Sequence, residues 1–70
     1  MEYAIVNFIE NRAVMANGKK LGQTNQTLLI EKGNHNFSLD GLQNYRPAQV
    51  MAVIKDTTTI TPYQITFNLV

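Results

Sequence analysis

The sequence predicts an all-β fold, a small antiparallel β-sandwich of about six or seven short strands. Asn17-Gly18 stands between two short segments, and Asn and Gly both tolerate the positive φ that two-residue hairpin turns require. Apolar residues recur at every second position in several segments rich in β-branched residues. Gly and Pro interrupt the chain too often for helices of three turns. These three observations together favour strands over helices.

The first expected strand runs from Tyr3 to Ile9. Alternation places Ala4, Val6 and Phe8 on one face of this strand. The opposite face also carries apolar residues, including an aromatic ring. We therefore expect this strand to lie in the centre of a sheet or to be covered on both faces.

A hairpin follows the first strand. Glu10-Asn11 has the composition of a turn, and residues 12–16 form a short strand that ends at Asn17-Gly18. Residues 19–22 begin the return strand. A second pair of strands, 27–31 and 34–39, flanks a turn at Lys32-Gly33, so we expect them to pair with each other. Alternation turns Phe37 and Leu39 toward the core.

Two further strands complete the prediction. Pro47 lacks the N–H that a ladder requires, so the next strand is expected over residues 48–55, with a short helix over 48–54 as the alternative. In this strand Met51 and Val53 lie on the face opposite Val50, Ala52 and Ile54. A threonine-rich bend then leads to Pro62, which marks the start of a strand or an edge. The last strand has the clearest alternation in the chain, and it places on one face Tyr63, Ile65, Phe67 and Leu69.

Length and composition limit the classes of protein that this chain can be. Seventy residues make a single domain, residues 1–70, whose core is too small to enclose a large active site. The chain has no cysteine and one histidine, which excludes a disulfide framework and a closed zinc site. We therefore expect neither a metal nor another cofactor, and no enzymatic activity.

The charges indicate what kinds of partner to expect. Six basic and five acidic side chains are scattered along the sequence and give a net charge of +1, which argues against nucleic acid as a partner. No apolar run is long enough to cross a bilayer, and the first ten residues lack the pattern of a signal peptide. If Met1 is the native start, these observations favour a cytoplasmic location.

Several short motifs follow one another along the chain: Ala13, Asn17-Gly18, Gly22-Gln23-Thr24, Gly33-Asn34-His35, Tyr45 and Leu69. In this order they resemble the pattern of PEGA domains, although Asn25 stands where that pattern has a proline. The resemblance implies a small β-sandwich that serves as a non-enzymatic accessory module, with carbohydrate or surface-layer association. It would place the chain outside the cytoplasm if this is an excised domain.

Two groups of residues are candidates for a site. Lys19, Lys20 and Lys32, together with Tyr45 or Tyr63, would make a basic and aromatic patch able to stack on a base or a sugar ring. The alternative is that these lysines protect sheet edges against unwanted pairing. The second group is structural and is expected to shape the turns: Asn17, Gly18, Gly22, Gly33 and His35, the last bonded to the turn at Gly33.

A further prediction concerns the unpaired edges of the sheets. The first strand, beginning near Met1, and the last, ending at Val70, carry few charges, so either is expected to pair with a protein partner or with a second copy. We therefore expect a protein-interaction or assembly module that acts through sheet edges and turns. The alternatives are a carbohydrate or cell-envelope binding module using Tyr45 and Tyr63, and a nucleic-acid binder of the small-barrel type.

Overall fold

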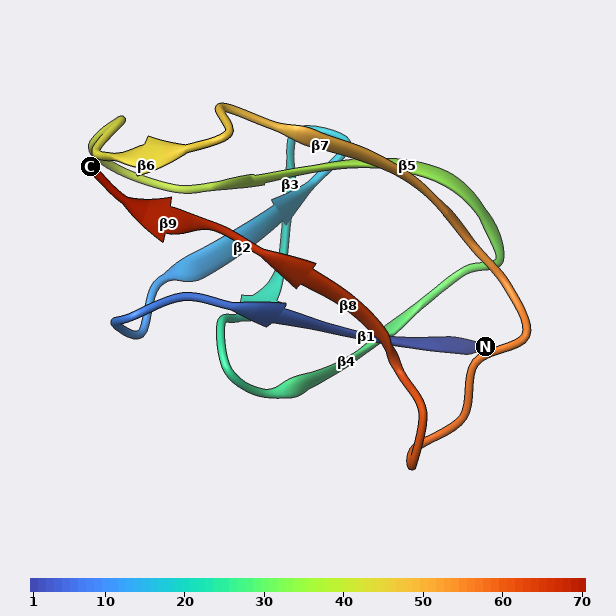
Figure 1. Ribbon diagram of the computed structural model, residues 1–70. Helices are drawn as coiled ribbons and strands as arrows, with labels where there is room; N and C mark the ends of the chain where they lie inside the picture. The colour runs from blue at the N-terminus through green and yellow to red at the C-terminus, as the bar shows by residue number, and fades with distance from the viewer.

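The computed structural model describes residues 1–70 as strands joined by turns, without a helix. The first of its two main sheets has three strands in the order β4-β1-β8 (Figure 1). Strand β1 (Glu2–Asn7) is central and pairs antiparallel with β4 (Thr27–Ile30) and parallel with β8 (Tyr63–Thr66). The predicted small all-β fold is confirmed, and the parallel pairing of β8 with β1 is the one departure from the expected antiparallel arrangement. The central position expected for the first strand is confirmed.

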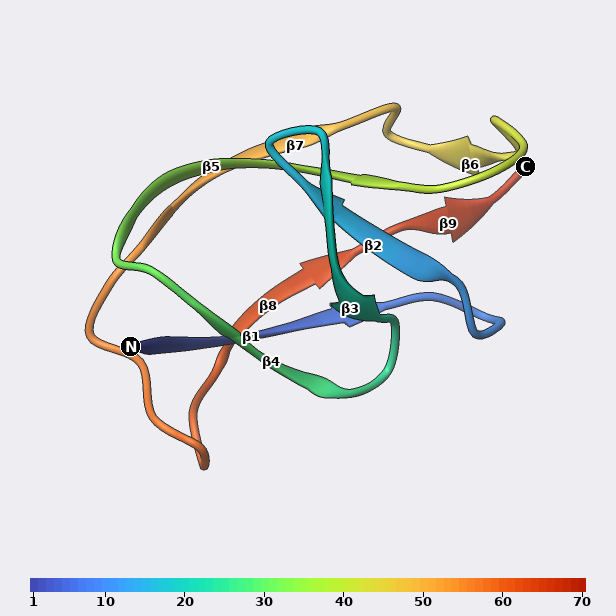
Figure 2. The same cartoon turned by 180° about the vertical axis from the view of Figure 1, so that it is seen from behind.

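The second sheet has four strands in the order β3-β2-β5-β7. Its members are β2 (Ala13–Ala16), β3 (Lys19–Gln23), β5 (Gly33–Leu39) and β7 (Val50–Ile54), all paired antiparallel. Figure 2 shows from behind how β5 and β7 run side by side along one side of this sheet. Residues 48–54 thus contribute a strand, and the helix alternative for them is excluded.

A pair of two-residue strands joins the two sheets at one end. β6 (Tyr45–Arg46) pairs antiparallel with β9 (Asn68–Leu69), which continues directly from β8. These two strands bring the total to nine, against the predicted six or seven. β6 was missed because two residues are too few to show an alternating pattern, whereas β9 lies within the last predicted strand, which is interrupted at Phe67.

The core between the sheets is one cluster of 13 buried hydrophobic residues. As predicted, the inward face of β1, the pair on β5 and the middle of the last strand belong to it, whereas Tyr63 and Leu69 at the ends of the last strand are exposed. The core residues are Ala4, Val6, Phe8, Val14, Leu28, Ile30, Phe37, Leu39, Tyr45, Ala52, Ile54, Ile65 and Phe67.

The connection at Lys32-Gly33 differs from the prediction. It joins β4 in one sheet to β5 in the other, so the two segments do not pair as a hairpin. Gly33 has a φ of 131°, a value that residues other than glycine rarely adopt. The chain can therefore change direction sharply there and pass from one sheet to the other. A hairpin at the same place would have required β4 and β5 to share a sheet.

The loop between β1 and β2 is held by polar side chains. The Thr24 hydroxyl donates to Glu10 O at 2.8 Å and accepts from Arg12 N–H at 2.9 Å, although Thr24 itself is completely buried. Asn25, with a φ of 64°, accepts a bond from Phe8 N–H at 3.1 Å through its side-chain oxygen. The buried main-chain groups of this loop thus find partners within the chain, as burial requires.

The opposite end of the molecule is tied by Glu2. Its carboxylate accepts hydrogen bonds from Thr57 N–H at 2.9 Å and from the Thr57 hydroxyl at 2.6 Å. The same hydroxyl oxygen accepts from Tyr3 N–H at 2.7 Å. These bonds connect the loop after β7 to the start of β1. They also lower the pKa of Glu2 below its ordinary value of 4.5, because hydrogen bonds from the Thr57 hydroxyl and main chain favour the charged form.

Candidate functional site

Tyr45 is buried, so little of its ring is accessible for the predicted stacking on a ligand, and its role in binding stays a prediction. Only 6% of the residue is exposed, and its ring packs edge-on against Phe67 at 5.3 Å and Phe8 at 6.3 Å between centroids. Its hydroxyl donates to Leu39 O at 2.9 Å and accepts from Leu39 N–H at 3.2 Å. Both its apolar surface and its hydroxyl are therefore used within the chain.

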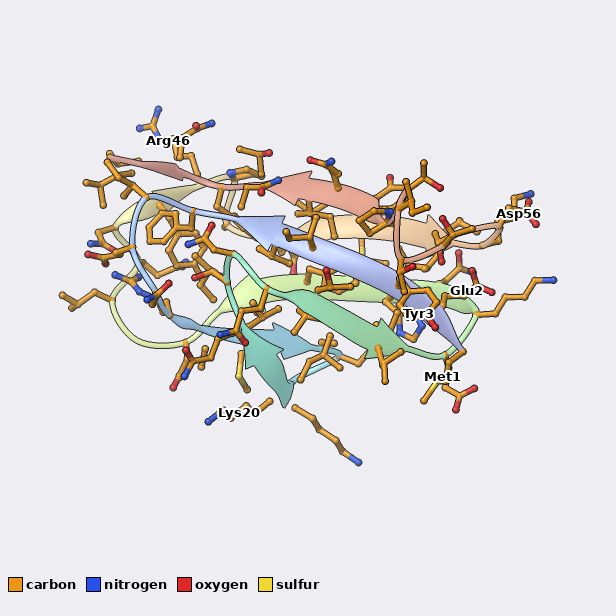
Figure 3. All side chains as sticks on the ribbon, turned by 90° about the horizontal axis from the view of Figure 1, so that it is seen from below. Met1, Glu2, Tyr3, Lys20, Arg46 and Asp56 are labelled. Atoms are coloured by element: carbon orange, nitrogen blue, oxygen red, sulfur yellow. The ribbon has the colours of Figure 1, made fainter.

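The other members of the predicted basic and aromatic patch are exposed but do not come together. Tyr63 is 38% exposed and lies on β8, at one edge of the three-stranded sheet. Lys19 and Lys20 are on β3, at the opposite side of the molecule, as the position of Lys20 in Figure 3 shows. Lys32 lies at the β4–β5 connection. The structure therefore does not assemble the patch, and two of its lysines occupy an edge strand.

His35 has a structural place. One ring nitrogen, Nε2, lies 2.7 Å from Glu31 O, and the other, Nδ1, lies 2.9 Å from the side-chain nitrogen of Asn17. A neutral ring that donates through Nε2 and accepts at Nδ1 satisfies both contacts. The side-chain oxygen of Asn17 in turn accepts from Asn36 N–H at 3.0 Å. His35 is thus in β5 rather than in a turn, and it connects two turns instead of presenting a base to a substrate.

The predicted turn residues fall into two classes. Asn17 and Gly18 have φ values of 55° and 81° and form the expected hairpin turn between β2 and β3. Gly22, in contrast, lies within β3, so its assignment to a turn was wrong. A Cβ atom at position 22 would lie 2.5 Å from Cδ2 of Leu28. Gly22 is small because β4 packs closely against β3 at this point.

The surface has one open hollow and no cluster of metal-ligating side chains. No three side chains of the types that ligate metals lie close together. A single open hollow is found beside β6 and β9, and Arg46 is the one charged residue in its lining. The Tyr45 hydroxyl is already bonded to Leu39 O. The lining residues are Gln43, Tyr45, Arg46, Pro47, Ala48 and Asn68. This hollow has no second charged group with which Arg46 could act.

The sheet edges differ strongly from one another. β3 carries two exposed lysines, Lys19 and Lys20, and a bulge opposite Val14-Met15, where Leu21 has no partner. Edge lysines and bulges are the devices that discourage a further strand from pairing. β4 is an edge of the other sheet; it is four residues long and has one exposed large apolar side chain, Leu29, at 53%. The β3 edge is therefore protected, whereas the β4 edge is uncharged and short.

The edge of β8 is short. Phe67 N–H donates to Asn7 O at 3.0 Å, so the odd-numbered residues of this strand bond to β1. The main-chain groups of Gln64 and Thr66 therefore face outward. Beyond Thr66 the same side of the strand is occupied by β6, because Arg46 pairs with Asn68. Proline precedes the strand at its other end. Little space is left there for a partner strand, so the predicted edge at the end of the chain is largely closed. The predicted edge at β1 was wrong, since β1 is paired on both sides.

The hydrogen bonds of β5 determine which side of β7 is free. Asp40 N–H donates to Ala13 O at 3.0 Å, and Asn17 N–H donates to Asn36 O at 2.8 Å. The even-numbered residues of β5 therefore bond to β2. Because residues of a strand alternate between its two sides, the odd-numbered residues of β5 bond to β7.

The odd-numbered residues of β5 are opposite the even-numbered residues of β7. The main-chain groups of Met51 and Val53 consequently face away from the sheet. Their side chains are 69% and 54% exposed on the outer face of the sheet. Residues 50–54 carry no charge, and β7 has neither a bulge nor a proline. We define Met51 and Val53, with the flanking Gln49 and Lys55, as the β7 edge.

The β7 edge is the candidate functional site, and sequence reasoning missed it. The segment was correctly predicted as a strand with Met51 and Val53 on one face. Which strand lies at an edge depends on strand order, however, and strand order is not visible in the alternation of one segment. None of the comparisons with protein-family models, with curated proteins or with solved structures finds a match for the chain. The structure has no helix able to cross a membrane.

Proposed function

We propose that this chain is a non-enzymatic protein-interaction and assembly module that binds an extended protein segment at the β7 edge. The observation that carries the proposal is the contrast between β7 and the other edge strands. β7 has two exposed apolar side chains beside outward main-chain groups and no charge within the strand, whereas β4 has one such side chain, β8 is short and β3 carries lysines and a bulge. Such an edge is the surface used in recognition by strand addition, where main-chain hydrogen bonds supply affinity.

The side chains of the β7 edge set the chemistry of the segment that fits. Met51 and Val53 project from the same face, two residues apart, so a paired strand would place alternate side chains beside them. Apolar or β-branched side chains at those positions would bury the exposed parts of both residues. Lys55 at the end of the edge disfavours a cation opposite it.

The resemblance to PEGA domains supports the same class of function, because it implies an accessory module without enzymatic activity. The carbohydrate-binding and nucleic-acid-binding alternatives each used Tyr45 or Tyr63 as the stacking residue. Tyr45 is buried, and Tyr63 lies on the side of the molecule opposite Lys20. Strand addition at β7 needs neither of these aromatic residues.

The test is to remove one donor from the β7 edge without disturbing the fold. Val53→Pro deletes an N–H that faces outward, and proline is tolerated at such edge positions. Gln64→Pro deletes an outward N–H from β8 and is the matched control. The tagged wild-type chain and both variants are used for affinity capture from a lysate of the source organism, after circular dichroism has shown that all three are folded.

We expect a captured protein to be retained by the Gln64→Pro variant and lost with Val53→Pro. A bound protein that both variants retain equally would contradict the assignment of the site to β7. Loss with Gln64→Pro alone would move the site to β8.

A further inference from the structure

We infer that the segment bound by the β7 edge is β7 of a second copy, paired antiparallel about a two-fold axis that passes beside Ala52. This inference rests on the proposed function and names its partner. Antiparallel pairing about Ala52 places Met51 of each copy opposite Val53 of the other. These are the residues whose main-chain groups face outward, so each such pair can exchange two hydrogen bonds.

The sequence of β7 is self-complementary about this axis. The five residues 50–54 are Val-Met-Ala-Val-Ile, which have no charge and are apolar at every symmetry-related position. One step further out, Gln49 of each copy would lie opposite Lys55 of the other, so no like charges face each other. Ala52, at the axis, points into the core and places no large side chain at the join.

Pairing would also bring together the exposed apolar side chains of the two copies. Met51 and Val53 are 69% and 54% exposed in a single copy and project from the same face of the sheet. In the paired arrangement the two residues of one copy would lie beside the two of the other. Direct cross-strand pairs of this type stabilise a sheet, and the buried area adds a hydrophobic contribution.

The arrangement of strands explains why such an assembly would stop at two copies. Joining β7 to β7 creates a continuous sheet of eight strands, whose two outer strands are both β3. β3 carries Lys19, Lys20 and the bulge at Leu21, which oppose the addition of a further strand. Both copies use the same surface, so the contact is isologous and closed.

The test uses two double variants that differ only in the sign of one charge. Met51→Lys with Val53→Lys places like charges opposite each other across the axis. Met51→Glu with Val53→Lys places opposite charges there, in the same register. Both positions are exposed in one copy, so both variants are expected to fold. The dissociation constant of the homodimer is measured for each by sedimentation velocity over a range of concentrations, together with the wild type.

We expect the wild type to form a dimer. The homodimer dissociation constant of the Met51→Lys, Val53→Lys variant should exceed that of the Met51→Glu, Val53→Lys variant by about tenfold or more. Added salt should reduce this difference. Equal dissociation of the two variants would overturn the register. A wild type that stays monomeric up to millimolar concentration would overturn self-pairing.

The capture experiment distinguishes the failure of this inference from the failure of the proposed function. A monomeric wild type that still captures a protein, lost with Val53→Pro, would overturn the second copy as the partner while leaving strand addition intact. If the wild type is monomeric and captures no protein that Val53→Pro loses, both self-pairing and strand addition at β7 are contradicted.

Discussion

Two regions of this molecule use their polar groups in opposite ways. Around Arg12, the guanidinium donates to Leu42 O at 3.0 Å and to the Asn44 side chain at 2.7 Å, and it forms an ion pair with Glu10. It also lies 5.1 Å from the centroid of the Phe8 ring. We call Arg12 and these partners the Arg12 cluster. At the β7 edge, in contrast, the outward main-chain groups face away from the chain.

The difference separates residues that hold the fold from residues that are available to a partner. The Arg12 guanidinium and the adjacent Thr24 and Tyr45 hydroxyls are hydrogen-bonded inside the protein, so a substitution there leaves a partner group unpaired. At Met51 and Val53, in contrast, a substitution removes no side-chain hydrogen bond from the single copy. Stability and association should therefore respond to different sets of substitutions, and the predictions below test this separation.

The largest effect is expected at Thr24. Thr24→Val keeps the shape of a completely buried side chain but leaves Arg12 N–H and Glu10 O without their partner. We expect a loss of about 2–4 kcal/mol in the free energy of unfolding, measured by urea denaturation. Thr66→Val, at an exposed position of β8, is the control and should change stability by less than about 0.5 kcal/mol. Similar losses in the two variants would show that the buried hydroxyl has no special role.

A smaller effect is expected at Tyr45. Tyr45→Phe keeps the aromatic packing but removes the hydroxyl that bonds both Leu39 N–H and Leu39 O. The free energy of unfolding should fall by about 1–2 kcal/mol in the same assay. Tyr63→Phe, at an exposed position of β8, is the control and should leave the free energy of unfolding almost unchanged. Loss of a ligand with Tyr45→Phe in a variant of undiminished stability would revive the binding role that its burial argues against.

The smallest effect is expected at Glu2 and depends on pH. The pKa of Glu2 is lowered in the folded protein, so the carboxylate contributes stability above its ordinary pKa of 4.5, and this contribution disappears as the pH falls through the lower folded value. Glu2→Gln removes the titration. Melting temperatures of the wild type and this variant should therefore differ at neutral pH and converge in acid. A difference that stays constant down to pH 3 would contradict this prediction.

Features of the fold that depend on neighbouring residues were predicted from the sequence, whereas those that depend on residues far apart in the chain were not. The turn at Asn17-Gly18 and the burial of Ile65 and Phe67 follow from adjacent residues, and both were predicted correctly. The pairing of β4 with β1 rather than with β5 depends on residues more than twenty positions apart in the chain. No local pattern distinguishes a turn within one sheet from a connection between two sheets.

The site was less predictable than the fold for the same reason. Tyr45 follows a turn, a position in the sequence where an aromatic residue is expected to be exposed. It is buried because β6 pairs with β9, which places its ring against Phe67. Alternation located the exposed face of β7 but did not show that β7 ends its sheet. Thr24 and Asn25 gave no signal either, because their partners lie in a loop far back in the sequence.

The most direct test of the β7 edge is amide hydrogen exchange followed by NMR at several protein concentrations. In a single copy the N–H groups of Met51 and Val53 face outward, so they should exchange rapidly in dilute solution. Their exchange should slow as concentration rises, while Gln64 and Thr66 keep the same rates. Concentration-independent exchange at Met51 and Val53, or protection appearing at Gln64 and Thr66 instead, would contradict the assignment of association to β7.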